Sequence, residues 1–308
     1  MQSIPAVIPA LISCLPGLVQ GGWRLFSFVA SRLLWLDAAL SGCENMVEFL
    51  RMILLGLVQG VAEFLPISSS GHLVLVERIL GISSSGAMLE VALHGGTLVS
   101  VFAYYRYRIA ELIAGVCRFE REALFYAAAL VIGSLPAFVA YLAFKHKIEE
   151  AFGSPHLTAL CMCVTGIVLL SLLFVRWDEK EKPIGLMRAF IVGLAQAVAL
   201  LPGVSRSGST IVTARHLRLA PEKAAEFSFM LSIPAQCGAV LFKGAEAYRD
   251  GTPGLQALPV LCGVAVAAVT GYFAINYLIK ALSAGKAWLF GLYCLIVGAT
   301  AAIAFWPR

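Results

Sequence analysis

Long blocks of apolar residues are the feature that most constrains this chain of 308 residues. Hydrophobic residues make up 60% of the sequence and charged residues only 13%, about half the charged share of a soluble domain. A soluble fold cannot bury so much apolar surface, so the composition indicates a polytopic membrane protein. It excludes soluble enzymes, secreted domains, disordered scaffolds and outer-membrane barrels, whose strands show short alternating segments.

Six blocks are long enough to cross a bilayer, since a spanning helix needs about 20 apolar residues. They cover residues 88–105, 123–144, 157–176, 224–243, 257–279 and 287–306. Two other apolar stretches, 52–80 and 186–217, are interrupted by polar runs that follow Pro66 and Pro202. Irregular backbone at membrane depth is tolerated only inside protein or beside water. We therefore expect two re-entrant helical hairpins with functional tips.

The two interrupted stretches are copies of one another. Residues 55–72, shifted by 137 positions, fall on residues 192–209 without a gap. The identical pairs are Gly56/Gly193, Leu57/Leu194, Gln59/Gln196, Val61/Val198, Ala62/Ala199, Ser68/Ser205, Ser70/Ser207 and Gly71/Gly208. The copies differ in the pairs Glu63/Leu200, Ser69/Arg206 and His72/Ser209. This divergence predicts complementary chemistry at the two tips.

The repeat predicts an all-α polytopic membrane protein with an inverted topology, in which each repeat has one hairpin and three spans. Repeat 1 covers about residues 46–182 and repeat 2 about residues 183–308 of a single membrane domain. Because three spans are an odd number, the second repeat enters from the opposite face, and the tips meet near the midplane. Loop Lys and Arg residues number thirteen on one face and seven on the other, which places the first face in the cytoplasm.

Residues 1–45 lie outside the repeat, and three interpretations compete for them. In one, the start codon is misassigned and Met46 is the true start; in another, the segment forms an extra span or an interfacial helix. In the third, the run that ends at Cys43 is a lipoprotein cleavage box, although Asp37 interrupts its apolar region.

The second tip is the sharpest chemical signal in the sequence. It combines four hydroxyls, a guanidinium and a glycine in the run Ser205, Arg206, Ser207, Gly208, Ser209 and Thr210. A helix that begins here presents free N–H groups and positive potential to an anion. Arg206 adds a bidentate fork that matches phosphate oxygens. The alternative is a serine-rich helix cap with Arg206 extended toward the membrane surface.

The first tip offers groups that can react with a bound anion, in the run Ser68, Ser69, Ser70, Gly71 and His72. A hydroxyl beside an imidazole suits a nucleophile with a base or an acid, and His72 can itself accept a phosphoryl group. Glu63 lies within an apolar run, one helical turn after Gln59. It can hold Mg²⁺ or Ca²⁺ together with Gln59, accept a proton, or pair with Arg206.

Other polar residues in apolar surroundings are secondary candidates. They are Glu90, His94 and Glu226, for which structural contacts between helices are the alternative. The eight cysteines show no metal-binding spacing and are interpreted as buried and inert. No basic run is interleaved with aromatic residues, so nucleic acid is not an expected partner. Taken together, the phosphate-binding tip, the carboxylate and the apolar helices indicate cleavage of a lipid phosphate or diphosphate.

The motifs that carry this chemistry resemble those of the undecaprenyl-diphosphatase, or bacitracin resistance protein, family. The resemblance lies in residues 59–72, 202–210 and 226–234 and extends over about 46–308. It implies an enzyme of the bacterial inner membrane that uses a divalent cation and opens to the outer, periplasmic face. Such an enzyme hydrolyses undecaprenyl diphosphate to undecaprenyl phosphate, recycles this lipid for peptidoglycan and other envelope polymers, and is compatible with a homodimer.

The resemblance also assigns roles to residues. Glu63 falls in the acidic motif of catalysis or metal binding, Ser69 at the proposed nucleophile, His72 at the catalytic histidine, and Arg206 at the phosphate-binding arginine. Some relatives have glutamate where this chain has Gln59, and residues 1–45 have no counterpart. The competing hypothesis is a transporter that carries a lipid phosphate on the same anion site, because inverted repeats with broken helices are also a transporter architecture.

Overall fold

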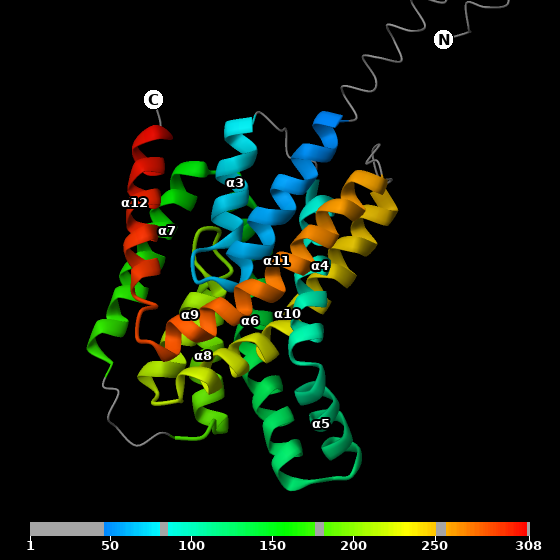
Figure 1. Ribbon diagram of the computed structural model, residues 1–308, viewed down its shortest axis with the longest axis vertical. Helices are drawn as coiled ribbons and strands as arrows, with labels where there is room; N and C mark the ends of the chain where they lie inside the picture. The colour runs from blue at the N-terminus through cyan, green and yellow to red at the C-terminus, as the bar shows by residue number, and fades with distance from the viewer. Residues whose placement is uncertain (1–45, 81–85, 176–181, 251–256, 307–308) are drawn as a thin grey trace, which may run out of the picture. The chain divides into compact units, whose positions relative to one another are not determined.

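The computed structural model describes residues 46–80, 86–175, 182–250 and 257–306, and its regular structure within these ranges is helical (Figure 1). The three interpretations of residues 1–45 fall outside the described residues. The chain divides after Leu50 into two units, and the description below concerns Arg51–Arg308.

Both interrupted stretches form a helix, a tight turn and a second helix, as predicted. The first helix ends at residue 64, and α3 (Ser69–Leu80) follows; in the second copy α8 (Leu186–Val198) is followed by α9 (Arg206–His216). Gly203 in the second turn has φ +93°, and a Cβ there would overlap the Thr158 carbonyl. Glycine is required at this position by both conformation and space.

Each predicted span corresponds to one helix, but the lengths differ from the prediction. The helices are α4 (Gly86–Tyr104), α6 (Arg121–Phe152), α7 (Pro155–Leu170, continued by η2, Ser171–Phe174), α10 (Pro221–Asp250), α11 (Ala257–Ser283) and α12 (Leu289–Ala304). Four described helices are long and apolar enough to cross a membrane: Arg121–Phe152, Pro155–Phe174, Pro221–Phe242 and Ala257–Ser283. The apolar part of α4, Val91–Tyr104, and α12 are shorter than expected. A turn through Gly285, with φ +67°, delays the start of α12.

The helix α5 (Arg106–Cys117) occupies a segment for which the sequence predicted only a loop between spans. Its apolar residues Ile109 and Leu112 lie on one face and pack against the main core. This amphipathic helix is shorter than a membrane span, so a search for apolar blocks of membrane length does not find it.

Glycines allow the helices to approach closely at corresponding places in the two copies. A Cβ at Gly56 would overlap the Gly263 carbonyl of α11, and one at Gly193 would overlap the Gly133 carbonyl of α6. α7 and α12 lie side by side (Figure 1), with Gly166 against Gly291. Small residues at such contacts let the backbones pack tightly, as is common between membrane helices.

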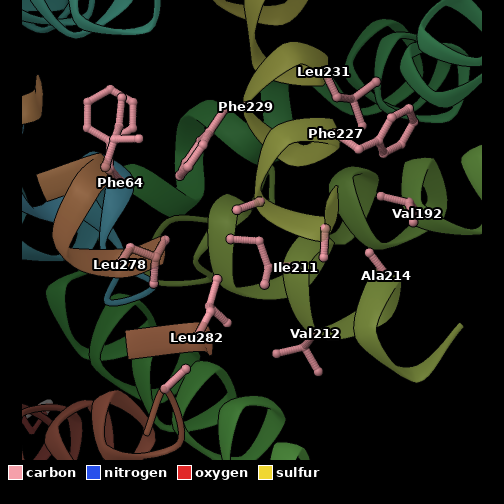
Figure 2. Packing of buried hydrophobic residues seen from close by; sticks show 14 of the residues in the cluster. Phe64, Val192, Ile211, Val212, Ala214, Phe227, Phe229, Leu231, Leu278 and Leu282 are labelled. Carbon is pink, nitrogen blue, oxygen red and sulfur yellow. The ribbon is translucent and has the colours of Figure 1, made fainter. Parts of the chain in front are cut away.

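The main core lies around α9 and α10 and reaches the residue next to Glu63 (Figure 2). Phe64 packs edge-on against Phe229, with ring centroids 5.4 Å apart, and so anchors the end of its helix. Large apolar side chains also cover the outside: Val131, Phe138 and Leu142 of α6 are each more than half exposed. Such a surface suits a lipid environment, and the fold is that of a multi-pass membrane protein.

Candidate functional site

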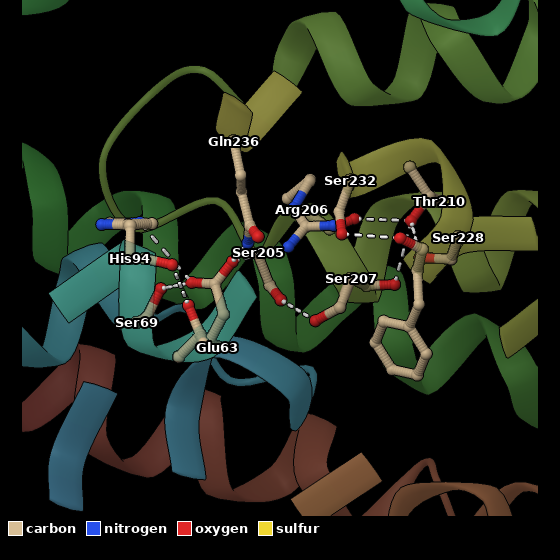
Figure 3. A network of polar contacts seen from close by, with 12 residues as sticks. Glu63, Ser69, His94, Ser205, Arg206, Ser207, Thr210, Ser228, Ser232 and Gln236 are labelled. Atoms are coloured by element: carbon tan, nitrogen blue, oxygen red, sulfur yellow. Dashed lines mark hydrogen bonds and ion pairs between the residues drawn. The ribbon is translucent and has the colours of Figure 1, made fainter. Parts of the chain in front are cut away.

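Glu63 lies at the centre of a buried polar network (Figure 3). Its Oε1 atom accepts hydrogen bonds from Arg206 Nη2 at 2.6 Å and from Gln236 Nε2 at 2.7 Å. Its Oε2 atom accepts from Ser69 Oγ at 2.6 Å and from Gln59 Nε2 at 3.2 Å. A buried carboxylate needs such partners, because an unpaired charge in an apolar interior is costly.

The two tips meet, as the sequence predicted. Besides the Arg206–Glu63 ion pair, the Gly203 N–H approaches Ser70 Oγ at 3.4 Å, and Ser207 Oγ donates to the Leu65 carbonyl at 3.4 Å. The Thr165 hydroxyl of α7 fixes the second tip, since it donates to the Gly203 carbonyl and accepts from the Ser205 N–H, at 2.8 and 2.9 Å. The relative position of the tips therefore rests on several bonds.

The residues that are identical in the two tips make the same capping hydrogen bond twice, although Ser68 has φ +70° and Ser205 has φ −70°. Ser68 Oγ accepts from the Gly71 N–H at 3.2 Å, and Ser205 Oγ accepts from the Gly208 N–H at 3.1 Å. Both pairs are helix N-caps, in which a hydroxyl satisfies an otherwise free amide. Each capping hydroxyl also lies 3.3 Å from that of the serine two positions on, Ser70 or Ser207.

Two of the hydroxyls predicted to bind phosphate, those of Ser209 and Thr210, are buried within the protein. Thr210 is fully buried, donates to the Arg206 carbonyl at 2.8 Å, and lies 2.6 Å from Ser228 of α10. Figure 3 shows Thr210 and Ser228 on the far side of Arg206 from Glu63. Ser209 is also buried and follows Gly208 inside α9. The part of the second tip that lies beside Glu63 is the start of α9, where Arg206 contacts the carboxylate.

His72 is held away from Ser69. Its Nδ1 atom is 2.8 Å from the Ser68 carbonyl, which can only accept, so Nδ1 carries the proton. The Nε2 atom therefore accepts from the Tyr293 hydroxyl of α12 at 2.8 Å, and the two rings are stacked. In this structure the partner of the Ser69 hydroxyl is Glu63, and the predicted serine–histidine pair is not formed. The reason is local: His72 lies one turn after Ser68, directly over its carbonyl.

The secondary candidates fall in different places. His94 of α4 joins the site, with Nε2 3.7 Å from Glu63 Oε2. Glu226 does not: it pairs with Arg108 and Lys223, each at 2.8 Å, near the start of α10. The side chain of Glu90 lies outside the described residues.

Sequence reasoning missed two members of the site, Gln236 and Tyr293. Gln236 is a buried amide in the apolar span that starts at residue 224, and this intramembrane polar residue was a signal that could have found it. Tyr293 gave no comparable signal, because a tyrosine hydroxyl in an apolar span usually finds a hydrogen-bond partner and the sequence does not show which one.

Three polar atoms around Glu63 are buried without a hydrogen-bond partner in the described part of the chain: Gln59 Oε1, Gln236 Oε1 and Arg206 Nη1. Nη1 can donate to a phosphate oxygen. The amide oxygens are ligands of the kind that Mg²⁺ and Ca²⁺ take. The described residues contain no cluster of three His, Cys, Asp or Glu side chains suited to a metal. A cation at this site would therefore have to take ligands from these amide oxygens and from a bound phosphate.

Fold and site together define a multi-pass membrane protein with a buried carboxylate–guanidinium centre that can receive a phosphate. Sequence comparison specifies the family: residues 52–300 match the model described as bacitracin resistance protein BacA, and the chain belongs to this family.

Curated relatives named undecaprenyl-diphosphatase cover most of the chain. One from Trichlorobacter lovleyi is 40% identical over 261 residues, 82% of this chain and 95% of its own length. One from Halothermothrix orenii is 37% identical over 253 residues, 82% of this chain and 96% of its own length. A relative from Korarchaeum cryptofilum is 36% identical, with 82% of this chain and 97% of its own length covered.

Proposed function

We propose that this protein hydrolyses undecaprenyl diphosphate to undecaprenyl phosphate and inorganic phosphate. The observation that carries the proposal is the Ser69–Glu63–Arg206 contact, in which a hydroxyl, a base and an anion-binding group meet beside an unpartnered donor. Curated relatives with this activity support it. The reaction returns the carrier lipid to the synthesis of peptidoglycan and other envelope polymers and lowers sensitivity to bacitracin.

The geometry favours Ser69 as the attacking group. As the Oγ–phosphorus bond forms, the Ser69 proton moves to Glu63 Oε2, and the bond from phosphorus to the oxygen of the lipid phosphate breaks. Undecaprenyl phosphate leaves, with Ser69 phosphorylated. Water then attacks this phosphorus, Glu63 returns its proton to Ser69 Oγ, and inorganic phosphate departs. Direct attack by water, with Glu63 as its base, is the alternative for the first step.

Arg206 couples phosphate binding to proton transfer at Glu63. In the absence of substrate, the 2.6 Å ion pair balances the charge of the carboxylate. A phosphate that binds Nη1 and draws the guanidinium away removes part of that interaction. Glu63 can then accept the proton that Ser69 loses. The start of α9 adds positive potential on the same side.

His72 is placed to move a proton at the second step. Its unprotonated Nε2 atom, reached through the Tyr293 hydroxyl, accepts the proton that the attacking water loses. The Ser68 carbonyl holds the ring in the tautomer that this role requires. Tyr293 is therefore both the orienting partner of His72 and its route to the water.

A divalent cation, Mg²⁺ or Ca²⁺, is part of the proposal. Glu63, Gln59 and Gln236 would hold it, and it would offset negative charge on the diphosphate. With Gln59 in place of a second carboxylate, the protein supplies less charge to the ion, so the substrate phosphates must complete its ligand set.

We further infer an inverted-repeat topology with the tips near the midplane of the bacterial inner membrane and the site open to the periplasmic face. The matched contacts Gly56–Gly263 and Gly193–Gly133 support it, since each first hairpin helix packs on a helix of the other repeat. The loop charges support the orientation. Labelling of single cysteines introduced at Lys145 and Arg188 in intact cells tests it: only the first is expected to react with an impermeant reagent.

The decisive experiment measures phosphate release from undecaprenyl diphosphate by the purified protein in detergent, with and without EDTA. Glu63→Gln and Arg206→Ala are the test variants, and Glu226→Gln is the matched control, because its carboxylate is also ion-paired but lies outside the site. Release that needs the cation and is lost only in the test variants supports the proposal. A folded protein that binds the lipid but releases no phosphate contradicts it and favours the lipid-phosphate transporter, which needs no nucleophile.

A further inference from the structure

A cavity with charged residues on a largely apolar wall lies near the start of α10, away from Glu63. It has a volume of about 300 Å³. Its walls come from α5, α6, the segment before α8, the turn before α10, and α10 itself. Glu226 lines it, whereas Gln236 of the same helix reaches Glu63. Ten helical residues separate these two side chains, about 15 Å along the axis, so the cavity is a separate site.

The charge on the cavity wall is positive. Arg108, Lys182 and Lys223 line it together with a single carboxylate, Glu226. Glu226 Oε1 accepts from Arg108 Nε, and Oε2 accepts from Lys223 Nζ, both at 2.8 Å. Glu111 also pairs with Arg108, at 2.8 Å, so the three cations face two carboxylates and one positive charge is left over. Burial opposes the charge of Arg108, but its hydrogen bonds to Glu111 and Glu226 raise its pKa, so the cation persists at physiological pH.

A buried hydroxyl in the cavity wall lacks a partner. The Tyr126 hydroxyl has no hydrogen bond within the described part of the chain, although the residue lines the cavity. The Arg108 guanidinium lies 5.1 Å from the centre of its ring, so the donor and the cation are adjacent. A buried hydroxyl without an acceptor is unfavourable. An acceptor that enters the cavity would satisfy it.

We propose that this cavity is a second anion site, which binds a phosphate monoester. Arg108 and Lys223 supply the charge, and the Tyr126 hydroxyl donates to a phosphate oxygen. Apolar wall residues such as Ile184 and Phe227 suit the carbon substituent of an ester. Two sources carry this chemistry: the head group of a lipid with a terminal phosphate, and a soluble phosphate ester. The proposal does not depend on the reaction at Glu63.

The test is a calorimetric titration of the full-length protein in detergent with glycerol 3-phosphate. Wild type is expected to bind two equivalents and Arg206→Ala one, because that variant removes the anion site at Glu63. In the Arg206→Ala background, Tyr126→Phe should weaken the remaining binding about tenfold, the worth of one hydrogen bond to a charged group. Tyr107→Phe, on the exposed side of α5, is the matched control and should change nothing.

A second variant and an experiment with lipid nanodiscs complete the test. Lys223→Gln should weaken binding at least as much as Tyr126→Phe, while Arg118→Gln, an exposed cation of the α5–α6 turn, should not. Native mass spectrometry from nanodiscs that contain phosphatidic acid or phosphatidylcholine then separates the sources. If phosphatidic acid is retained selectively and Lys223→Gln abolishes this retention, the ligand is a lipid head group. If glycerol 3-phosphate binds in calorimetry but phosphatidic acid is not retained, the ligand is a soluble ester.

Two results would overturn the proposal. One is the loss of all glycerol 3-phosphate binding in Arg206→Ala that remains folded, with only one equivalent bound by wild type. The other is equal binding by Tyr126→Phe, Lys223→Gln and their controls. Diphosphate hydrolysis in the Tyr126 and Lys223 variants is expected to equal that of wild type, so failure of this site leaves the function proposed at Glu63 untouched.

Discussion

The two hairpin tips are copies of one sequence, yet they contribute differently to the site. The positions that match, Ser68/Ser205 and Gly71/Gly208, form the same capping contact in both. The positions that differ carry the reactive groups. Ser69 and Arg206 are equivalent positions, and both bind Glu63, on its two separate oxygens. The copies have kept the residues that build the turn and have diverged in the residues that face the shared carboxylate.

Gln59 and Gln196 show what the presence of Glu63 changes. They are identical residues at equivalent positions, and both are buried. Gln59 donates to Glu63, whereas Leu200 stands at the equivalent place in the second copy. There, neither amide atom of Gln196 has a hydrogen-bond partner among the described residues. Two substitutions therefore account for the asymmetry: leucine in place of Glu63 leaves the second tip without a base, and arginine in place of Ser69 gives it a cation.

Ser69→Ala tests the first tip, which carries the proposed nucleophile, and should have the largest effect on the rate. Removal of the nucleophile is expected to lower the rate of phosphate release by about 10⁴-fold or more. Ser70→Ala is the matched control, because among the described residues this neighbouring hydroxyl bonds to Ser68 and the Gly203 amide and not to Glu63. Phosphate release is measured at saturating lipid. A loss of less than about tenfold in Ser69→Ala would instead assign the attack to water.

Glu63→Gln removes the base while it keeps the shape of the side chain. The rate is expected to fall by about 10³-fold, the range of general base catalysis. Because Glu63 binds both tips, its loss should also make the effect of Arg206→Lys smaller than in wild type. The double-variant cycle in phosphate release measures this coupling. Independent, additive effects of the two substitutions would show that the ion pair does not couple the tips.

Arg206→Lys tests the second tip, because it keeps the charge but loses the bidentate fork. Lysine cannot bind Glu63 and a phosphate oxygen with separate nitrogens, so the rate is expected to fall by about 100-fold. The Michaelis constant for the lipid should rise as well. Arg188→Lys, at a half-buried arginine bonded to the Pro183 carbonyl, is the control. Wild-type kinetics in Arg206→Lys would show that Arg206 acts through its positive charge and not through its two separate nitrogens.

Tyr293→Phe should lower the rate by about tenfold, which corresponds to one lost hydrogen bond to His72. The effect should appear in the turnover number and in the shape of the pH–rate profile, because the variant changes how His72 exchanges a proton. Tyr277→Phe of α11 serves as a control, since its ring packs on Phe290 away from the site. A profile that is unchanged in shape would make Tyr293 a packing residue.

Much of the site followed from the sequence because its parts lie in two short, matching segments. The interrupted helices, the meeting of the tips and the Glu63–Arg206 pair all depend on residues close together in one motif or its copy. The parts that the sequence did not predict depend on distant helices. Gln236 and Tyr293 reach the site from α10 and α12, and the link of Ser69 to Glu63 rather than to His72 depends on rotamers within a turn. The helix α5 was not predicted from the sequence for a similar reason, because its apolar face is recognised only from its packing against the core.

The smallest expected effect is also the strictest test of the duplicated scaffold. Ser68→Ala and Ser205→Ala each remove one helix cap, and each should lower the free energy of unfolding by about 1 kcal/mol. The two losses should be of similar size because the capping distances match, although Ser68 has φ +70° and Ser205 has φ −70°. Thermal unfolding in detergent measures both, with Ser171→Ala of η2 as a control outside the tips. Phosphate release should change little in either variant. If only Ser205→Ala lost activity, the second cap would itself bind phosphate, and the division between scaffold and reactive positions would not hold at this residue.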